Sequence, residues 1–298
     1  MHKAYASNSP VWLKVIQWLG VMALLTVVAM GIWAVLSGDN ASTTSLKWFQ
    51  FIQTLGTFFL PPLVCAWLWS EKPIEWLHLK NRNPLWLYGG TMLLMVIAIP
   101  GINLLADWNS RLVLPECMSG LEAWLKAQEE AAAALTERFL SGTSIGVLLV
   151  NIGLMALLPA MAEELTFRGV VQGLLSGSNT KSHIAVWVTA ILFSAIHMQF
   201  YGFIPRMLLG ALFGYALLWT GSLWVPITMH FTNNLIAVVG YWIVYNKGIN
   251  PETIDAFGTG STAWVGGLSL VLTAVGVYFF WRLSRQISSA SSRISAGN

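Results

Sequence analysis

Eight apolar stretches of membrane-spanning length constrain the fold of this chain more than any other feature. They cover residues 11–36, 47–69, 84–106, 143–175, 182–200, 203–220, 223–246 and 262–282. A helix needs about 20 apolar residues to cross the hydrocarbon core of a bilayer. Because backbone groups inside lipid must be hydrogen-bonded within the chain, each stretch predicts a helix. The sequence therefore predicts an all-α, polytopic membrane helix bundle of about eight transmembrane helices, forming a single integral membrane domain over residues 1–298.

The composition agrees with a membrane protein. Charged residues make up only 10% of the chain, whereas a soluble protein carries about 25%. The 16 tryptophans suit the two membrane–water interfaces, where their amphipathic rings are favoured. The net charge of +3 is small, and the basic residues form no patch of the kind that binds nucleic acid. The lipid bilayer is the predicted environment, and nucleic acid is not a predicted partner.

Two segments differ from the apolar stretches. Residues 116–140 have apolar side chains at helical spacing, with glutamates between them, which predicts an amphipathic extramembrane helix on the membrane surface or across the end of the bundle. The serine-rich segment 283–298 predicts a disordered tail. Eight spans place both termini on one side. Lysines and arginines are more numerous on that side, so we expect both termini in the cytoplasm and the protein in the cell inner membrane.

Ionisable side chains inside the apolar stretches are the candidates for function, because each costs several kcal/mol in lipid unless it is paired or solvated. They are grouped in three of the stretches, together with one amide: Glu163, Glu164, Arg168, His197, His230 and Asn234. At a rise of 1.5 Å per residue, Glu163 lies ~20 Å from the shared loops, His197 ~22 Å, Asn234 ~18 Å and His230 ~12 Å. Three helices thus bring these groups to similar depths in the bilayer.

Helical geometry separates the roles of the two glutamates. Adjacent residues of a helix point about 100° apart, so Glu163 and Glu164 cannot face the same point. Glu164 precedes Arg168 by four residues, the favoured order for an ion pair on a helix. This pairing supports the site and leaves Glu163 free to face the interior of the bundle.

A cluster of this composition can activate water. A desolvated glutamate such as Glu163 is a suitable general base, and His197 can share or carry the proton. His230 and Asn234 lie four residues apart on one helix face and supply hydrogen-bond donors for a developing oxyanion. A divalent metal such as zinc is an open alternative, because Glu163, His197 and His230 are all acceptable ligands. Their spacing is not the His-Glu-x-x-His type, and the metal-free mechanism is favoured.

The order and surroundings of these residues resemble a known family. The sequence reads Glu163-Glu164-Leu165-Thr166-Phe167-Arg168, then Phe193-Ser194-Ala195-Ile196-His197, then Thr220-Gly221-Ser222-Leu223-Trp224 ahead of His230 and Asn234. This pattern resembles the CAAX protease and bacteriocin-processing (Abi, CPBP) family of intramembrane endopeptidases, with a catalytic core over residues 143–240. The resemblance implies that Glu163 and His197 activate the attacking water and that His230 and Asn234 form the oxyanion hole.

The sequence therefore predicts an intramembrane endopeptidase whose substrate is a membrane-associated protein or peptide. Two alternatives from other classes stay open. One is a proton- or ion-coupled transporter, since intramembrane Glu and His also mark proton relays, but no second copy of the segments that hold them is visible. The other is a non-catalytic bacteriocin-immunity or scaffold protein that keeps the fold without turnover.

Overall fold

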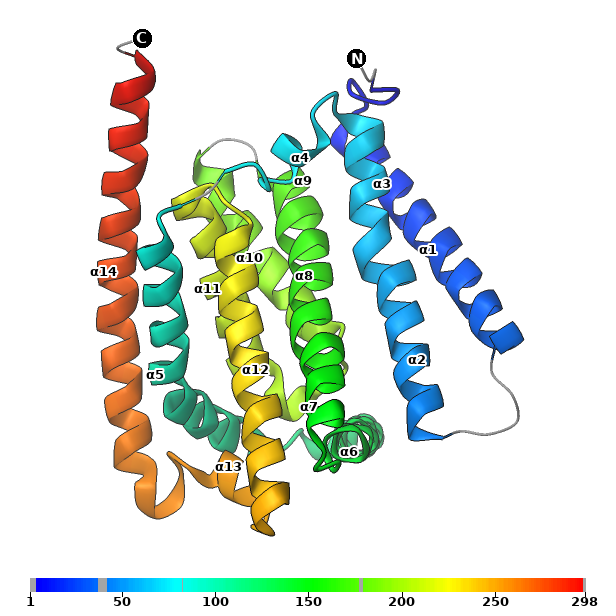
Figure 1. Ribbon diagram of the computed structural model, residues 1–298, viewed down its shortest axis with the longest axis vertical. Coiled ribbons are helices and arrows are strands. Elements are labelled where there is room, and N and C mark those ends of the chain that lie inside the picture. Colours follow the sequence, from blue (N-terminus) through cyan, green and yellow to red (C-terminus); the bar gives the residue numbers. More distant parts are fainter. Residues whose placement is uncertain (1–3, 37–41, 82, 177–178, 297–298) are drawn as a thin grey trace.

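The computed structural model describes residues 4–36, 42–81, 83–176 and 179–296, which fold into helices with no strand among them (Figure 1). The α-helices are α1 Val11–Leu36, α2 Thr43–Thr54, α3 Leu60–Trp69, α4 Pro73–Trp76, α5 Leu85–Ser110, α6 Ser119–Leu140, α7 Ile145–Asn151, α8 Leu158–Glu164, α9 Gly173–Leu175, α10 Asn179–Ala195, α11 Phe203–Thr220, α12 Trp224–Lys247, α13 Glu252–Ala256 and α14 Ala263–Ala296. π-helical turns occupy η1 Leu55–Phe59, η3 Ile152–Leu157 and η4 Leu165–Gln172, and 3-10 turns occupy η2 Glu116–Met118, η5 Phe200–Gly202 and η6 Gly260–Thr262.

Most of the predicted spans are confirmed as continuous helical stretches. Within the described chain, seven stretches are long and apolar enough to cross a membrane: Val11–Leu36, Thr43–Trp69, Leu85–Ser110, Ile145–Leu175, Phe200–Thr220, Trp224–Lys247 and Glu252–Gln286. The stretch predicted at 182–200 forms a shorter apolar helix, Ser182–Ala195. The protein is therefore an integral membrane protein with a polytopic helical bundle.

The two ends of the bundle differ in what covers them. The start of α1 and the end of α14 lie at the same end of the molecule (Figure 1). At the opposite end, α6 is seen nearly end-on, so it crosses the bundle rather than running along it (Figure 1). Leu121, Trp124 and Leu135 of α6 stay about half exposed, while Phe139 and Leu140 at its C-terminal end are buried. The helix predicted for residues 116–140 is thus present, and much of its apolar face is uncovered by protein.

The tail is more ordered than its composition predicts. α14 continues to Ala296, so the prediction of a disordered segment over 283–298 is wrong as far as Ala296, and residues 297–298 lie outside the described chain. The guanidinium of Arg282 lies 5.9 Å from the ring centre of Tyr278, and that of Arg285 lies 5.3 Å from Trp281. These cation–π contacts between residues four apart favour continuation of the helix beyond the apolar stretch.

Proline interrupts the second span, and a neighbouring helix repairs the interruption. Pro62 has no N–H, so it cannot donate to the carbonyl of Phe58, its usual helical partner. The hydroxyl of Thr166 donates to that carbonyl instead, at 2.7 Å. Inside a membrane such a replacement partner is required for an exposed backbone group. The break at Pro61–Pro62 therefore ties the second span to the helix that carries the two glutamates.

α5 continues through Pro100 but is bent there (Figure 1). The next residue, Gly101, donates its N–H to the hydroxyl of Ser269 on α14 at 3.0 Å, and that hydroxyl donates to the carbonyl of Ile97. A side chain inserted into the hydrogen-bond ladder is a recognised cause of a helix bend. The bend in α5 is visible in Figure 1.

The two helices that flank the candidate site pack closely through glycine. A Cβ atom at Gly210 of α11 would lie 3.3 Å from the backbone Cα of Ala190 on α10, and one at Gly214 would lie 3.0 Å from a methyl group of Val186. Small residues four apart permit this close approach. It leaves the Gly210 and Gly214 carbonyls free to accept from the side chains of Arg168 and Gln172.

Candidate active site

The side chains of Glu163, His197 and His230 meet around one point inside the bundle. Glu163 is the second-to-last residue of α8, His197 follows the end of α10, and His230 lies in the first half of α12. The Oε2 atom of Glu163 lies 4.0 Å from Nε2 of His197 and 3.9 Å from Nε2 of His230. Residues 33 to 67 positions apart in the sequence are thus brought together.

This meeting point opens into a cavity of about 300 Å³. Its lining combines the polar residues with apolar ones from α5, α10 and α11: Ile102, Ala106, Glu163, Phe193, His197, Gly202, Pro205, Arg206, Leu209, Phe213, His230, Asn233 and Asn234. The side chain of Glu163 is 18% exposed, whereas that of Glu164 is fully buried. Of the two glutamates, Glu163 is therefore the one that a water molecule or a substrate can reach.

Glu164 and Arg168 form a buried pair behind the cavity. Nη1 of Arg168 donates to Oε1 of Glu164 at 2.8 Å, and both side chains are fully buried. Nη2 of Arg168 donates to the carbonyl of Gly210, also at 2.8 Å. A buried charge pair is stable only when its geometry is good and further hydrogen bonds satisfy its atoms. The pair fastens the helix of the two glutamates to α11.

His230 is also held by this pair, a contact that helical spacing alone does not reveal. Its Nδ1 lies 2.8 Å from Oε1 of Glu164. The ring of Phe213 stacks on the His230 imidazole, with ring centres 5.3 Å apart and planes 21° apart. Phe193 meets the same imidazole edge to face at 5.9 Å. The guanidinium of Arg168 lies 4.6 Å from the Phe193 ring centre. Phe193 thus contacts both the imidazole of His230 and the guanidinium of Arg168.

The hydrogen bonds define which nitrogen of each histidine faces Glu163. Nδ1 of His197 lies 2.8 Å from the carbonyl of Phe193, and a carbonyl can only accept a hydrogen bond. Nδ1 of His230 lies against the carboxylate of Glu164, which accepts when ionised. Both Nδ1 atoms therefore carry a proton. Both Nε2 atoms are turned toward Glu163, where each can accept or donate a proton in a reaction.

His197 lies in a turn and not, as its place in the stretch 182–200 predicts, within a membrane helix. α10 ends at Ala195, and Met198 adopts a left-handed backbone conformation with φ 54°. Such a conformation is uncommon for a side chain other than glycine, asparagine or aspartate, and it occurs where the surroundings enforce it. The tight turn points the imidazole back toward Glu163.

A buried amide fastens the connection that follows this turn. Asn109 of α5 is fully buried, its Nδ2 donates to the carbonyl of Phe200, and its Oδ1 accepts from the N–H of Ile204. The hydroxyl of Ser194 donates to the carbonyl of Phe203. Because these bonds satisfy the backbone between α10 and α11 inside the protein, the turn that carries His197 is fixed to α5. Nothing in the sequence pattern singled out Asn109.

Asn234 lines the cavity with its amide donor available. Nδ2 of Asn233 donates to Oδ1 of Asn234 at 3.4 Å, a long hydrogen bond that engages the carbonyl end of the Asn234 amide. Its NH₂ group has no hydrogen-bond partner among the described residues. Together with His230, one turn earlier on α12, Asn234 places polar groups on one wall of the cavity.

Arg206 also lines the cavity, although it is not among the residues singled out from the sequence. Its Nη2 donates to Oε1 of Gln199 at 2.8 Å, and Nη1 donates to the Gln199 carbonyl at 3.4 Å. No acidic side chain of the described chain lies within ion-pair distance of it. The signal was available: Arg206 is the fourth residue of the apolar stretch 203–220, and an ionisable residue inside a span is a functional candidate by default.

π-helical turns flank the short helix that carries the two glutamates. η3 ends directly before α8, and η4 begins directly after Glu164. Such turns occur mostly as single insertions in α-helices, often at functional sites. They change the direction in which side chains point, so Glu163 enters the cavity while Arg168, on η4, faces Gly210. Pro159 at the start of α8 removes a donor at the first of these changes.

The residues do not fit a shared zinc ion as they are placed. Two ligand atoms at tetrahedral angles around zinc lie about 3.4 Å apart, whereas Glu163 Oε2 lies 3.9–4.0 Å from the two Nε2 atoms. In the part of the chain that the structure describes, no group of three or more His, Cys, Asp or Glu residues is arranged to hold a metal ion. The spacing leaves room for a small molecule such as water to lie between the three groups.

Comparisons with known proteins find a family model that matches the segment containing this cluster. Residues 145–236 match the family model described as type II CAAX prenyl endopeptidase Rce1-like. The uncharacterized protein YpbD of Bacillus subtilis (strain 168) is 37% identical over 81 residues, which are 26% of this chain and 38% of YpbD. The match thus spans less than two fifths of that relative's length. No solved structure matches the chain.

The matched segment begins with α7 and ends within α12, so it holds all six residues singled out from the sequence. The helices α1 to α6, α13 and α14 lie outside it. Residues 145–236 of this membrane-spanning chain are therefore similar to the Rce1-like family described as type II CAAX prenyl endopeptidases.

Proposed function

We propose that this protein is an intramembrane endopeptidase that hydrolyses a peptide bond of a membrane-associated protein or peptide. The observation that carries the proposal is the meeting of Glu163, His197 and His230 in one cavity within the Rce1-like segment. Few arrangements other than catalysis or proton transfer account for three ionisable groups within a membrane bundle. We further propose that the protein resides in the cell inner membrane with both termini in the cytoplasm.

The geometry suits attack by an activated water. A water molecule between the three groups donates a proton to Oε2 of Glu163, and its oxygen forms a bond to the carbonyl carbon of the substrate. His197, whose Nε2 faces the same point, accepts or returns this proton. When the tetrahedral intermediate collapses, the C–N bond breaks and the leaving nitrogen takes the proton. The products are a new carboxyl terminus and a new amine.

His230 and Asn234 are placed to stabilise the negative charge that develops on the carbonyl oxygen. The free NH₂ group of Asn234 is one donor. His230 becomes the second when its imidazole is protonated, because its Nδ1–H continues to donate to Glu164 while the added proton on Nε2 faces the cavity. Donors fixed before the reaction are effective because they need no reorganisation in the transition state. Glu164 and Arg168 contribute by holding His230 and the glutamate helix in place.

The proposal is tested by comparing the peptides of host membranes that contain either the wild-type protein or Glu163→Ala. We expect peptides with new termini in the wild-type membranes that are missing from the variant, because the variant lacks the base. Equal abundance of both proteins in the membrane, measured by immunoblot, is the control. Identical peptide profiles at equal abundance would contradict an endopeptidase activity.

The metal-free mechanism predicts that His230→Gln keeps about tenfold more activity than His230→Ala, because glutamine retains a donor near the oxyanion. Glutamine is a poor zinc ligand, so a tight zinc site would lose activity in both variants. Activity of each variant is measured alongside the metal content of the purified protein. Stoichiometric zinc that leaves together with activity on chelation would contradict the metal-free mechanism.

The cavity cation should also contribute to turnover. Arg206→Met is expected to lower the rate about 10- to 100-fold, because a positive charge beside the reaction centre stabilises developing negative charge. Gly202→Ala provides a gentler variant, since its Cβ would lie 3.0 Å from Nη2 of Arg206 and displace the guanidinium. Arg111→Met, at an exposed arginine of α5's C-terminal end, is the matched control. Unchanged rates in both cavity variants would exclude this contribution.

A further inference from the structure

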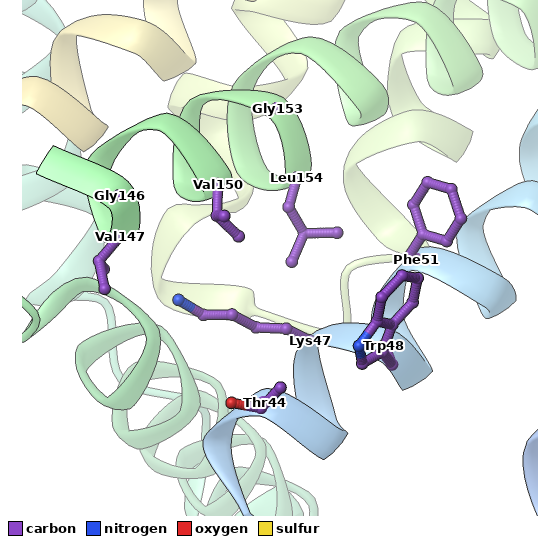
Figure 2. A pocket seen from close by; sticks show the side chains of 9 residues that line it. All are labelled: Thr44, Lys47, Trp48, Phe51, Gly146, Val147, Val150, Gly153 and Leu154. Atoms are coloured by element: carbon purple, nitrogen blue, oxygen red, sulfur yellow. The ribbon is translucent and has the colours of Figure 1, made fainter. Parts of the chain in front are cut away.

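A second, larger cavity of about 560 Å³ lies between α2 and the helical segment α7–η3 (Figure 2). It is lined by Thr44, Lys47, Trp48, Phe51, Gly146, Val147, Val150, Gly153 and Leu154, and it shares no residue with the lining of the catalytic cavity. Apart from Thr44 and Lys47, its side chains are apolar or aromatic. The match to the Rce1-like family begins at residue 145, so one wall of this groove, α2, lies outside the matched segment.

Lys47 is the one charged residue among those that line the groove. Its ammonium donates to Oδ1 of Asn151 at 2.6 Å and to the carbonyl of Phe139 at 3.2 Å. Asn151 is itself fastened to Phe139 through a bond from its Nδ2 to the same carbonyl. An ammonium has three N–H donors, so one stays available. No acidic side chain of the described chain lies within ion-pair distance of Lys47, and its positive charge meets only neutral oxygens and the ring of Phe139, whose centre is 5.6 Å away.

The groove has a polar end and an apolar end. α2 begins at Thr43 and α7 at Ile145, and both start at the end of the bundle where α6 lies (Figure 1). Thr44 and Gly146 therefore mark the shallow end, with Lys47 about one turn deeper, near the membrane–water interface. At a rise of 1.5 Å per residue, Phe51 lies about 10 Å beyond Thr44 on α2, and Leu154 lies about 12 Å beyond Gly146 on the facing segment. The cation near the interface suits an anionic headgroup, and the apolar trough beyond it suits the hydrocarbon chain of an amphiphile.

The trough is open because glycine faces it. A Cβ atom added at Gly153 would meet no atom within 4 Å, so the backbone of η3 leaves free space where another residue would fill it. Figure 2 shows the Lys47 side chain extended beneath Val150, with Leu154, Trp48 and Phe51 around the other part of the cavity. A flexible acyl chain can occupy such a trough, and tryptophan favours the level of lipid headgroups.

We propose that this groove is a binding site for an anionic phospholipid. The phosphate accepts a hydrogen bond from the remaining N–H of Lys47 and balances its charge, and one acyl chain lies along Val150, Gly153, Leu154 and Phe51. Charge complementarity selects the anionic headgroup, because a lysine near a lipid surface is attracted to anionic lipids. The lipid fills the gap between α2 and α7, so it connects the N-terminal helices to the segment that carries the catalytic cluster.

The test is native mass spectrometry of the purified full-length protein with equal amounts of phosphatidylglycerol and phosphatidylcholine of the same acyl chains. The wild-type protein is expected to retain phosphatidylglycerol about five- to tenfold more than phosphatidylcholine. Lys47→Gln, which keeps a donor but no charge, should lose this preference, and Lys47→Arg should keep it. Gly153→Leu, which fills the trough, should lower the retention of phosphatidylglycerol.

Gly31→Leu is the matched control, because Gly31 on α1 also has open space around it and lies away from the groove. Its lipid retention should equal that of the wild type. The proposal is wrong if Lys47→Gln and Gly153→Leu both retain phosphatidylglycerol as the wild type does. If Lys47→Gln does not fold, Gly153→Leu alone decides. Thermal stabilisation by inorganic phosphate alone that equals the effect of phosphatidylglycerol would replace the lipid site by a simple anion site.

Discussion

Glu163→Gln should lower turnover by about 10²–10⁴-fold while the protein stays folded. Glutamine has the shape of glutamate and can still form hydrogen bonds, but it cannot accept a proton from water. The Glu163 side chain lines the cavity and is partly exposed, so it makes no buried ion pair that the fold requires. The measurement is the rate at which purified, reconstituted protein cleaves a substrate found in host membranes, together with its Tm.

Glu130→Gln is the matched control for this variant, because it removes one carboxylate from an exposed position on α6. Its rate and Tm should equal those of the wild type. A Glu163→Gln protein that turns over at close to the wild-type rate would show that Glu163 is not the base.

Glu164→Ala should destabilise the folded protein by about 3–5 kcal/mol, far more than Glu163→Ala. The reason is the burial of Arg168, which keeps a fully buried positive charge when its carboxylate partner is removed. The carbonyl of Gly210 and the ring of Phe193 compensate only part of that charge. His230 also loses the oxygen that holds its Nδ1. Thermal unfolding of the two single variants in the same detergent measures the difference.

The double variant Glu164→Gln with Arg168→Met separates charge from packing. It removes both charges and keeps side chains of similar length, so we expect it to unfold at a higher temperature than Glu164→Ala, since replacement of a whole buried ion pair is often nearly neutral. Equal Tm values for Glu164→Ala and Glu163→Ala would contradict the structural role of the buried pair. A double variant no more stable than Glu164→Ala would show that packing, rather than charge, dominates.

Apolar length and helical periodicity were enough to predict most of the fold. The boundaries of α1 and α11 agree with the predicted stretches, because a run of apolar residues between polar ends has few alternatives in a bilayer. The Glu164–Arg168 ion pair was predicted for a similar reason, since a spacing of four residues determines a contact within one helix. Contacts within an element follow directly from the order of residues.

Contacts between elements were not predictable to the same extent. The bond from His230 to Glu164 joins two helices, and it depends on how α12 is rotated against α8. The turn at His197 depends on the left-handed backbone of Met198 and on the bonds made by Asn109, neither of which has a signature in apolar periodicity. The continuation of α14 past residue 282 depends on arginine contacts with aromatic rings one turn earlier, which composition alone cannot reveal.

We propose that water activated by Glu163 is the nucleophile in peptide-bond hydrolysis. It is tested by incubating membranes that contain the wild-type protein or Glu163→Gln in heavy-oxygen water and analysing their peptides by mass spectrometry. We expect peptides whose new carboxyl termini carry heavy oxygen in the wild-type sample and that are missing from the variant. New termini that carry heavy oxygen equally in both samples, or no new termini in either, would contradict it.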